Sequence, residues 1–170
     1  MIAYIHGASA TGESFTHIRQ YVRDYFEEPD ILLDYKSENG FDNNLKEMKG
    51  KLDDAERIFF ISHSLGGIYA LHLANYYKET TKGGVSLSTP YGGSAEADFA
   101  RYFLPFNRLM KDIGAIRGPL FDSRYIEAPK NWTQIVTTEG ASPWIVDDND
   151  GVVTLKSMRF RTDFEQIELP

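Results

Sequence analysis

The chain has 170 residues, of which 42% are apolar and 25% charged, so it can form one domain with one substantial core. Its net charge of −7 argues against a nucleic-acid partner, because phosphate contacts require clustered lysine and arginine. The absence of cysteine excludes disulfides, cysteine nucleophiles and cysteine-ligated metals. No apolar run approaches membrane-spanning length and no secretory signal is visible, so we expect a cytoplasmic protein without stable membrane insertion.

The first third of the chain alternates between β-rich and helical patterns. Short apolar runs predict strands, and apolar residues at helical spacing predict amphipathic helices. The expected strands are residues 2–5 and 31–33, and the expected helices are residues 13–26 and 42–54. Asp42 or Asn43 is the expected cap of the second helix.

The stretch from Ile58 to Gly67 reads as a strand, a sharp turn and the start of a helix. Four apolar residues precede a polar triplet with Ser64 at its centre, and two glycines then open an apolar helical segment that runs to about Tyr77. Such a turn exposes a hydroxyl beside the free N–H groups of a helix N-terminus, which stabilise an oxyanion. The competing interpretation is a serine that only caps the helix.

Beyond this helix the alternation continues. Gly83 and Gly84 are expected to end the unit, and the remaining strands are expected at residues 85–87, 132–138 and 164–169. This order predicts a three-layer α/β sandwich with a mainly parallel sheet and helices on both faces. Ligands of such sheets bind beyond the carboxyl ends of the strands, where Ala8 and Ser64 would lie.

Three segments carry a resemblance to a known family. Ser62-His63-Ser64-Leu65-Gly66 resembles the nucleophile elbow of the α/β-hydrolases, usually G-x-S-x-G, with serine in place of the first glycine. A strand that ends in His6-Gly7 resembles the oxyanion loop of that family, and residues 88–94 resemble the Thr-Pro-x-x-Gly-Ser segment of small lipases and esterases. The resemblance covers nearly the whole chain and implies a minimal α/β-hydrolase fold.

The resemblance also implies roles for particular residues. Ser64 would be the nucleophile, and the N–H groups of Ala8 and Leu65 would hold the oxyanion. His6 would brace the loop rather than act as the base. Tyr91, in the segment after the fourth strand, is expected to contact the substrate.

The run Asn149-Asp150-Gly151-Val152-Val153 resembles the lipase acid loop, which gives Asp150 the role of orienting a catalytic histidine. Two other interpretations stay open for residues 147–150: a calcium loop, because this run is rich in oxygen ligands, and a plain acidic turn.

We expect a single domain over residues 1–170 with a lid-like or cap-like insertion at about 95–130. The aromatic-rich run at 99–113 would either line an acyl pocket or pack on the core. It is also the basis of a weaker hypothesis, a role at membrane surfaces.

The expected function is cleavage of a small-molecule or lipid carboxylic ester through an acyl-enzyme on Ser64, without metal or cofactor. In the family the catalytic histidine follows the last strand, whereas all four histidines here precede Asp150. Two explanations stay open: the histidine lies beyond Pro170, or the protein is a catalytically inactive hydrolase-fold binding protein. An amidase or thioesterase with the same machinery is the alternative within enzymes.

Overall fold

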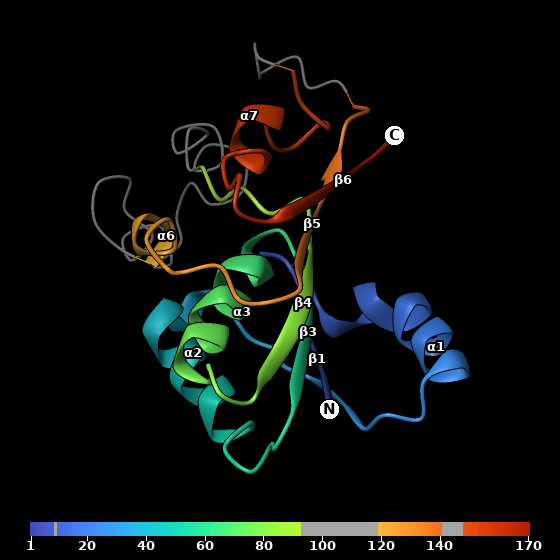
Figure 1. Cartoon of the computed structure of the whole chain (residues 1–170), viewed down its shortest axis with the longest axis vertical. Helices are drawn as coiled ribbons and strands as arrows, with labels where there is room; N and C mark the ends of the chain where they lie inside the picture. The colour runs from blue at the N-terminus through green and yellow to red at the C-terminus, as the bar shows by residue number, and fades with distance from the viewer. Residues whose placement is uncertain (9, 93–118, 141–147) are drawn as a thin grey trace.

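The computed structural model describes residues 1–8, 10–92, 119–140 and 148–170, and its centre is a six-stranded sheet (Figure 1). The strand order is β2-β1-β3-β4-β5-β6, and every pair of neighbours is parallel. The strands are β1 (Ile2–Ile5), β2 (Asp30–Leu32), β3 (Ile58–His63), β4 (Thr81–Leu87), β5 (Trp132–Thr137) and β6 (Glu165–Leu169). The predicted parallel α/β architecture is confirmed.

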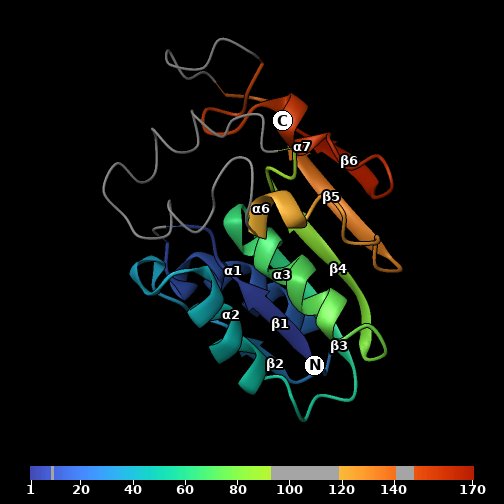
Figure 2. The same cartoon turned by 90° about the vertical axis from the view of Figure 1, so that its left-hand side faces the viewer.

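Helices cover both faces of this sheet. Helix α1 lies on one face, and α2, α3 and α6 lie on the other, as the views in Figures 1 and 2 show. The helical elements are η1 (Gly12–Phe15), α1 (Thr16–Tyr25), η2 (Ser37–Asn39), α2 (Phe41–Gly50), α3 (Leu65–Tyr76), α6 (Pro119–Asp122) and α7 (Leu155–Met158). None of the helices in the described ranges is long and apolar enough to cross a membrane.

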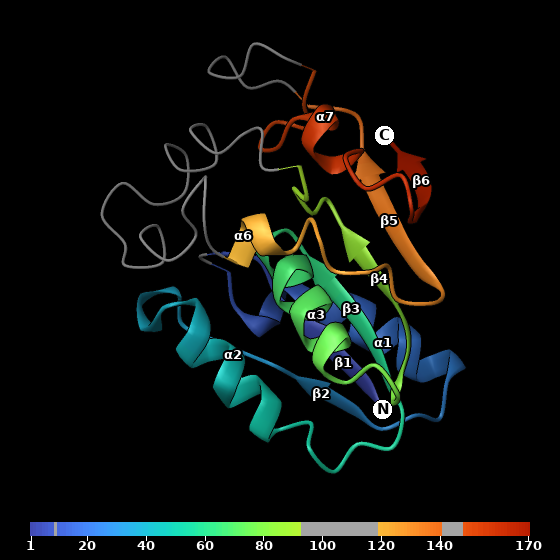
Figure 3. The ribbon, with the colours of Figure 1, turned by 60° about the vertical axis from the view of Figure 1, so that its left-hand side comes forward.

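The core is built around β3 and α3. In β3 the side chains of Ile58 and Phe60 are fully buried, whereas the alternate residues on the other face are only partly buried. Nine of the twelve residues of α3 are buried, because the helix packs on the sheet and also against α2 (Figure 3). A helix that is apolar nearly all round is expected where both sides are covered.

The prediction that Gly83 and Gly84 end a unit was wrong, because both lie inside β4. Gly84 pairs with Trp132 of β5, and a methyl group on Gly84 would lie 2.6 Å from Cζ3 of that ring. The tryptophan ring therefore takes the space of the missing side chain. Glycines that predict a strand end can instead make room for an aromatic ring on the next strand.

The predicted cap of α2 was also wrong. The helix begins at Phe41 and ends at Gly50, and Gly40 with φ 82° occupies the N-cap. The turn before it is fixed from within the helix, since the Asn44 amide donates hydrogen bonds to the Lys36 carbonyl at 2.9 Å and to the Tyr69 hydroxyl at 3.2 Å. Glycine adopts a positive φ without steric cost, and this N-cap has no side-chain hydrogen bond to the helix.

The predicted lid region lies mostly outside the described residues, which resume at Pro119. The segment from 119 to 130 contains α6, and buried Arg161 ties this segment to the loop before β6. Its guanidinium donates hydrogen bonds of 2.7 Å to the carbonyls of Ser123 and Ile126, and it also pairs with Asp163. Arg161 therefore fixes the position of residues 119–130 relative to the loop before β6.

Asp30 attaches α1 to the sheet. Its carboxylate, at the start of β2, accepts hydrogen bonds from the guanidinium groups of Arg19 and Arg23 on α1 at 2.5 to 2.9 Å. The Asp30 side chain is almost fully buried, and the hydrogen bond from Arg23 holds the pKa of this carboxyl below its usual range. The charged form of Asp30 therefore stabilises the fold.

Replacing Asp30 with asparagine should lower the free energy of unfolding by about 2 kcal/mol at neutral pH, because a charge-assisted pair is lost. Because the pKa of Asp30 is lowered on folding, its stabilisation is complete above the unfolded value of about 3.9 and is lost as the pH falls through the folded value. Urea unfolding at neutral and acid pH measures the difference between the variant and wild type, which should shrink in acid.

Asp24→Asn is the control, since Asp24 is exposed on α1 and accepts one hydrogen bond from Gln20. It should change stability by less than about 0.5 kcal/mol. An effect of Asp30→Asn that is the same at both pH values would contradict the assigned ion pair.

Candidate active site

Ser64 occupies the sharp turn between β3 and α3. Its backbone has φ 51° and ψ −124°, a conformation that non-glycine residues rarely adopt. The turn is held on both sides, because the Ser64 N–H donates to the Leu87 carbonyl at 2.8 Å and the Ser64 carbonyl accepts from the Thr89 hydroxyl at 3.1 Å. This geometry matches the predicted strand-turn-helix and places the serine at the carboxyl edge of the sheet.

The two glycines after the turn are required by close packing. A methyl group on Gly66 would lie 2.2 Å from the Ile5 carbonyl oxygen, and one on Gly67 would lie 2.0 Å from the Thr89 hydroxyl. Both distances are far below van der Waals contact. The chain after β1 and the chain after β4 can therefore approach the turn only because no side chain intervenes.

The variant Gly66→Ala should lower the free energy of unfolding by about 2 kcal/mol, because the new methyl group overlaps backbone that cannot easily move. Helix propensity alone would favour alanine by about 1 kcal/mol, so the sign of the change separates the two effects. Urea unfolding gives the measurement. Gly50→Ala at the end of α2, where nothing lies within 4 Å, is the control and should be neutral or slightly stabilising. A Gly66→Ala protein as stable as wild type would refute the packing argument.

The predicted oxyanion donors lie on two elements that meet at Ser64. Leu65 is the first residue of α3, so its N–H has no acceptor within the helix. Gly7, the neighbour of Ala8, lies against the turn, since a methyl group on Gly7 would come within 3.1 Å of the Ser64 Cβ. The backbone hydrogen bonds among the described residues include none donated by Ala8.

Asp150 lies in the loop after β5 and is held by three hydrogen bonds. One carboxylate oxygen accepts from the N–H groups of Val152 at 2.9 Å and Val153 at 2.8 Å, and the other accepts from the Thr137 hydroxyl. Thr137 ends β5 and also contacts the Ser88 hydroxyl at 2.8 Å. A chain of side chains thus connects Asp150 to the end of β4, beside the Leu87 carbonyl that holds Ser64.

Two further oxygen atoms of this loop accept hydrogen bonds from backbone N–H groups. The Asn149 side chain accepts from the Gly151 N–H at 2.8 Å, and the Asp148 carbonyl accepts from the Leu155 N–H at 2.8 Å. The fourth residue of the calcium interpretation, Asp147, lies outside the described residues. Within the ranges that the structure describes, no group of three or more acidic, histidine or cysteine side chains could hold a metal ion.

The four histidines have different surroundings. His6 is buried beside β2, His17 is exposed on α1, and His72 on α3 contacts the Pro119 carbonyl at 2.8 Å. Burial lowers the pKa of His72, as expected for a packed helix residue. His63 is the histidine next to the turn, and our sequence analysis gave it no role although it directly precedes Ser64.

His63 and Ser64 lie against the same residue. A methyl group on Gly7 would come within 3.0 Å of the His63 Nδ1 as well as within 3.1 Å of the Ser64 Cβ. Although part of the His63 side chain is exposed, desolvation lowers its pKa below the usual range, while the negative charge of Asp150 acts in the opposite direction. The charge of His6 adds to the lowering. Asp150 is therefore close enough to influence an imidazole beside Ser64.

Replacing Asp150 with asparagine should lower the pKa of His63 further, because the charge that favours the imidazolium disappears. An NMR titration of the His63 ring proton measures this value directly. Asp148→Asn removes the same charge two residues away and should leave the His63 pKa where it is. Equal effects of the two variants would show that Asp150 does not face the site.

Tyr91 does not lie where a substrate contact was predicted. Its side chain is fully buried, its ring packs against Phe164 with centroids 5.1 Å apart, and its hydroxyl donates to the Gly67 carbonyl at 3.5 Å. Burial raises the pKa of Tyr91 to about 12. The described residues therefore give Tyr91 a packing role behind α3, and the prediction of substrate contact finds no support in this placement.

The architecture and the turn at Ser64 together define an α/β-hydrolase fold. The mature lipase BlEst2 of Bacillus licheniformis superimposes with a TM-score of 0.62 at 14% identity, over 98% of this chain and 81% of that chain. A monoacylglycerol lipase of Paleococcus ferrophilus gives 0.58 at 13% identity, over 99% and 83% of the two chains. Est1E of Butyrivibrio proteoclasticus, solved with ferulic acid bound, gives 0.62 at 13% identity, over 99% and 78%.

The likeness is confined to the fold. No protein-family model matches the sequence, and no curated protein matches it in sequence. The roles of Ser64, Asp150, Ala8 and Leu65 remain predictions that rest on the local geometry described above.

Proposed function

We propose that this protein is a serine hydrolase that cleaves carboxylic esters through an acyl-enzyme on Ser64. The observation that carries the proposal is the Ser64 backbone, held at φ 51° between β3 and α3 with a helix N-terminus directly behind it. A serine that only capped a helix would have no need of this strained conformation, and its side chain caps nothing here. The lipases and esterases that share the fold make ester cleavage the leading reaction.

In the proposed reaction the Ser64 Oγ attacks the ester carbonyl carbon and forms a C–O bond, while the carbonyl π electrons move to the oxygen. The N–H groups of Ala8 and Leu65 stabilise that oxyanion. Collapse of the tetrahedral intermediate breaks the bond to the alcohol, which leaves with a proton. Water then attacks the acyl-enzyme in the same way and releases the carboxylic acid and the free serine.

An imidazole must take the Ser64 proton and return it to the leaving alcohol. In our proposal Asp150 orients that imidazole, because its carboxylate is fixed by Thr137 and by the loop N–H groups. A histidine beyond Pro170 and a catalytically inactive protein both remain as the two explanations given above. Neither a metal nor a cofactor enters any step, and an amide or thioester substrate would use the same steps.

A second candidate function is a binding protein that keeps the hydrolase fold without the reaction. The observation in its favour concerns the histidines, all four of which lie in the described residues. His6 pairs with Asp34, His72 contacts the Pro119 carbonyl and His17 is exposed on α1, while His63 directly precedes Ser64 in the chain. The following experiment separates the two functions.

The protein expressed from its native gene should form a covalent adduct with a fluorophosphonate probe at Ser64, and Ser64→Ala should form none. Hydrolysis of p-nitrophenyl esters should fall by about a million-fold in Ser64→Ala, by analogy with nucleophile deletion in another serine hydrolase. Intact mass spectrometry and peptide mapping locate the adduct. Ser37→Ala, in the turn before α2, should react like wild type.

A wild-type protein that gives no adduct and hydrolyses esters no faster than Ser64→Ala would overturn the enzyme hypothesis and leave the binding protein. If the adduct forms, the rates with matched ester, thioester and amide substrates identify the bond that is cleaved.

A further inference from the structure

We propose that Asp34 is a positioning residue for the oxyanion donor Ala8, acting through His6. No motif in the sequence points to Asp34. This residue lies in the loop after β2, whereas Ala8 lies in the loop after β1. The proposal deepens the function proposed above and rests on it for its effect on the reaction.

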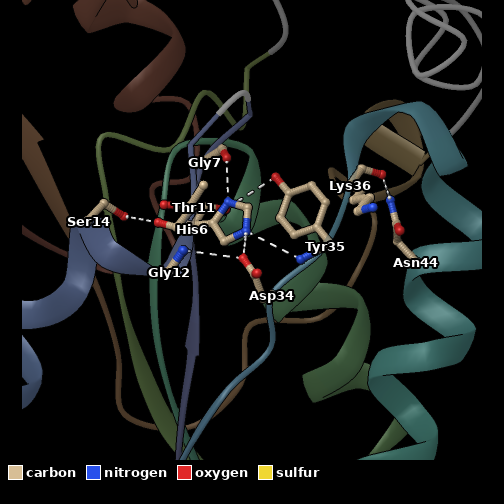
Figure 4. Close-up of polar contacts among 9 residues, drawn as sticks. All are labelled: His6, Gly7, Thr11, Gly12, Ser14, Asp34, Tyr35, Lys36 and Asn44. Carbon is tan, nitrogen blue, oxygen red and sulfur yellow. Dashed lines mark hydrogen bonds and ion pairs between the residues drawn. The ribbon is translucent and has the colours of Figure 1, made fainter.

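One oxygen of Asp34 holds both ends of the loop that carries Ala8. The Asp34 Oδ1 lies 2.6 Å from the His6 Nε2 at the start of this loop and accepts a hydrogen bond of 3.2 Å from the Gly12 N–H at its end. Figure 4 shows the carboxylate between these two groups. Residues 6 and 12 are thereby fixed relative to each other and to β2.

The second ring nitrogen of His6 reaches into the loop. Its Nδ1 lies 2.8 Å from the Gly7 carbonyl oxygen, which can only accept, so Nδ1 carries a hydrogen. The same oxygen also accepts from the Ala10 N–H at 3.4 Å. The Nε2 on the other side of the ring lies 2.6 Å from the Asp34 carboxylate oxygen, so the imidazole bridges the carboxylate and the Gly7 carbonyl (Figure 4).

The orientation of the Gly7 carbonyl decides the direction of the Ala8 N–H. The two groups belong to one planar peptide, and in a trans peptide they point in opposite directions. Holding the carbonyl toward His6 therefore turns the N–H of Ala8 away from His6. Because Gly7 packs against the Ser64 Cβ, the Gly7–Ala8 peptide lies beside the proposed nucleophile.

Tyr35 keeps the imidazole from rotating. Its ring stacks on His6 with centroids 4.3 Å apart and an interplanar angle of 1°. Its hydroxyl donates to the His6 carbonyl at 3.2 Å, and its N–H approaches the His6 Nε2 at 3.3 Å. The imidazole is thus fixed in plane and in position, and the Asp34 Oδ1 holds its Nε2 edge.

Asp34 is exposed, with 59% of its side-chain surface accessible, so its contribution to stability should be small. A role in positioning and a role in stability therefore make different predictions. Asp34→Ala should lower kcat by about 10-fold, less than the 100-fold or more from losing an oxyanion donor outright. KM should stay unchanged, because the oxyanion is absent from the bound substrate and develops only in the transition state and the tetrahedral intermediate. The melting temperature should also stay close to that of wild type.

A second measurement reads the peptide directly and does not depend on activity. The residual dipolar coupling of the Ala8 N–H, recorded by NMR in a weakly aligning medium, should change in Asp34→Ala because the Gly7–Ala8 peptide is no longer held. Asp34→Asn keeps the shape and one acceptor, so it should restore most of kcat and the coupling. Asp54→Ala removes an exposed charge after α2 and should change neither.

Unchanged kcat and an unchanged Ala8 coupling in Asp34→Ala would overturn the proposal, and so would a loss of activity that follows a loss of folded protein. If wild type proves as inactive as Ser64→Ala, the function proposed above fails. The Ala8 coupling then decides alone whether Asp34 positions this peptide.

Discussion

The contact between Gly66 and the carbonyl oxygens of Ile5 and His6 is the constraint on which the site depends. It brings the end of β1 against the first turn of α3, directly beside the Ser64 turn. Any side chain at residue 66 would push these segments apart and separate the two predicted oxyanion donors. One close approach of backbone thus sets the distance between elements that are sixty residues apart in the chain.

Hydrogen bonds between segments fix three further groups at the carboxyl edge of the sheet. A side chain from another segment holds each functional group: Asp34 holds His6 before Ala8, Thr89 holds the Ser64 carbonyl, and Thr137 holds the Asp150 carboxylate. Hydrogen bonds of this kind fix a functional group from outside its own loop as well as from within it. The geometry of the site is therefore a property of the whole sheet edge rather than of any single motif.

Much of the fold could be predicted from the sequence because its elements have strong local patterns. The apolar run of β3, the polar turn and the glycines before α3 lie within ten consecutive residues, so the turn at Ser64 was predictable. Gly84 was misread because the ring that fills its space belongs to Trp132, and Gly83 because it lies against the Asn131 carbonyl, both about fifty residues away. Local pattern cannot reveal a partner at that separation.

The same contrast between local and long-range contacts decides which parts of the candidate site could be predicted. Ser64, Asp150 and the donors came from short motifs, whereas the influence of Asp150 on His63 and the bridge from Asp34 to His6 depend on packing between separate strands. Neither contact has a spacing that a sequence could display. Tyr91 shows the converse, since its motif predicted a ligand contact and its environment is the core.

Backbone strain supplies the strongest physical reason to expect function at this edge. Among the described non-glycine residues, positive φ occurs at Ser64, Ser88 and Asn131. Asn131 lies in the turn before β5, where asparagine is tolerated, but the two serines follow the ends of adjacent strands β3 and β4. Each such conformation costs about 1–3 kcal/mol.

Ser64 carries that cost at the helix N-terminus. Ser88 carries it where its hydroxyl contacts Thr137, which in turn contacts Asp150. A fold kept only for stability would gain by relaxing both turns. Both turns lie at one edge of the sheet, one at the proposed nucleophile and the other connected to the proposed acid. This favours a site in which the position of a hydroxyl matters more than the stability of its turn.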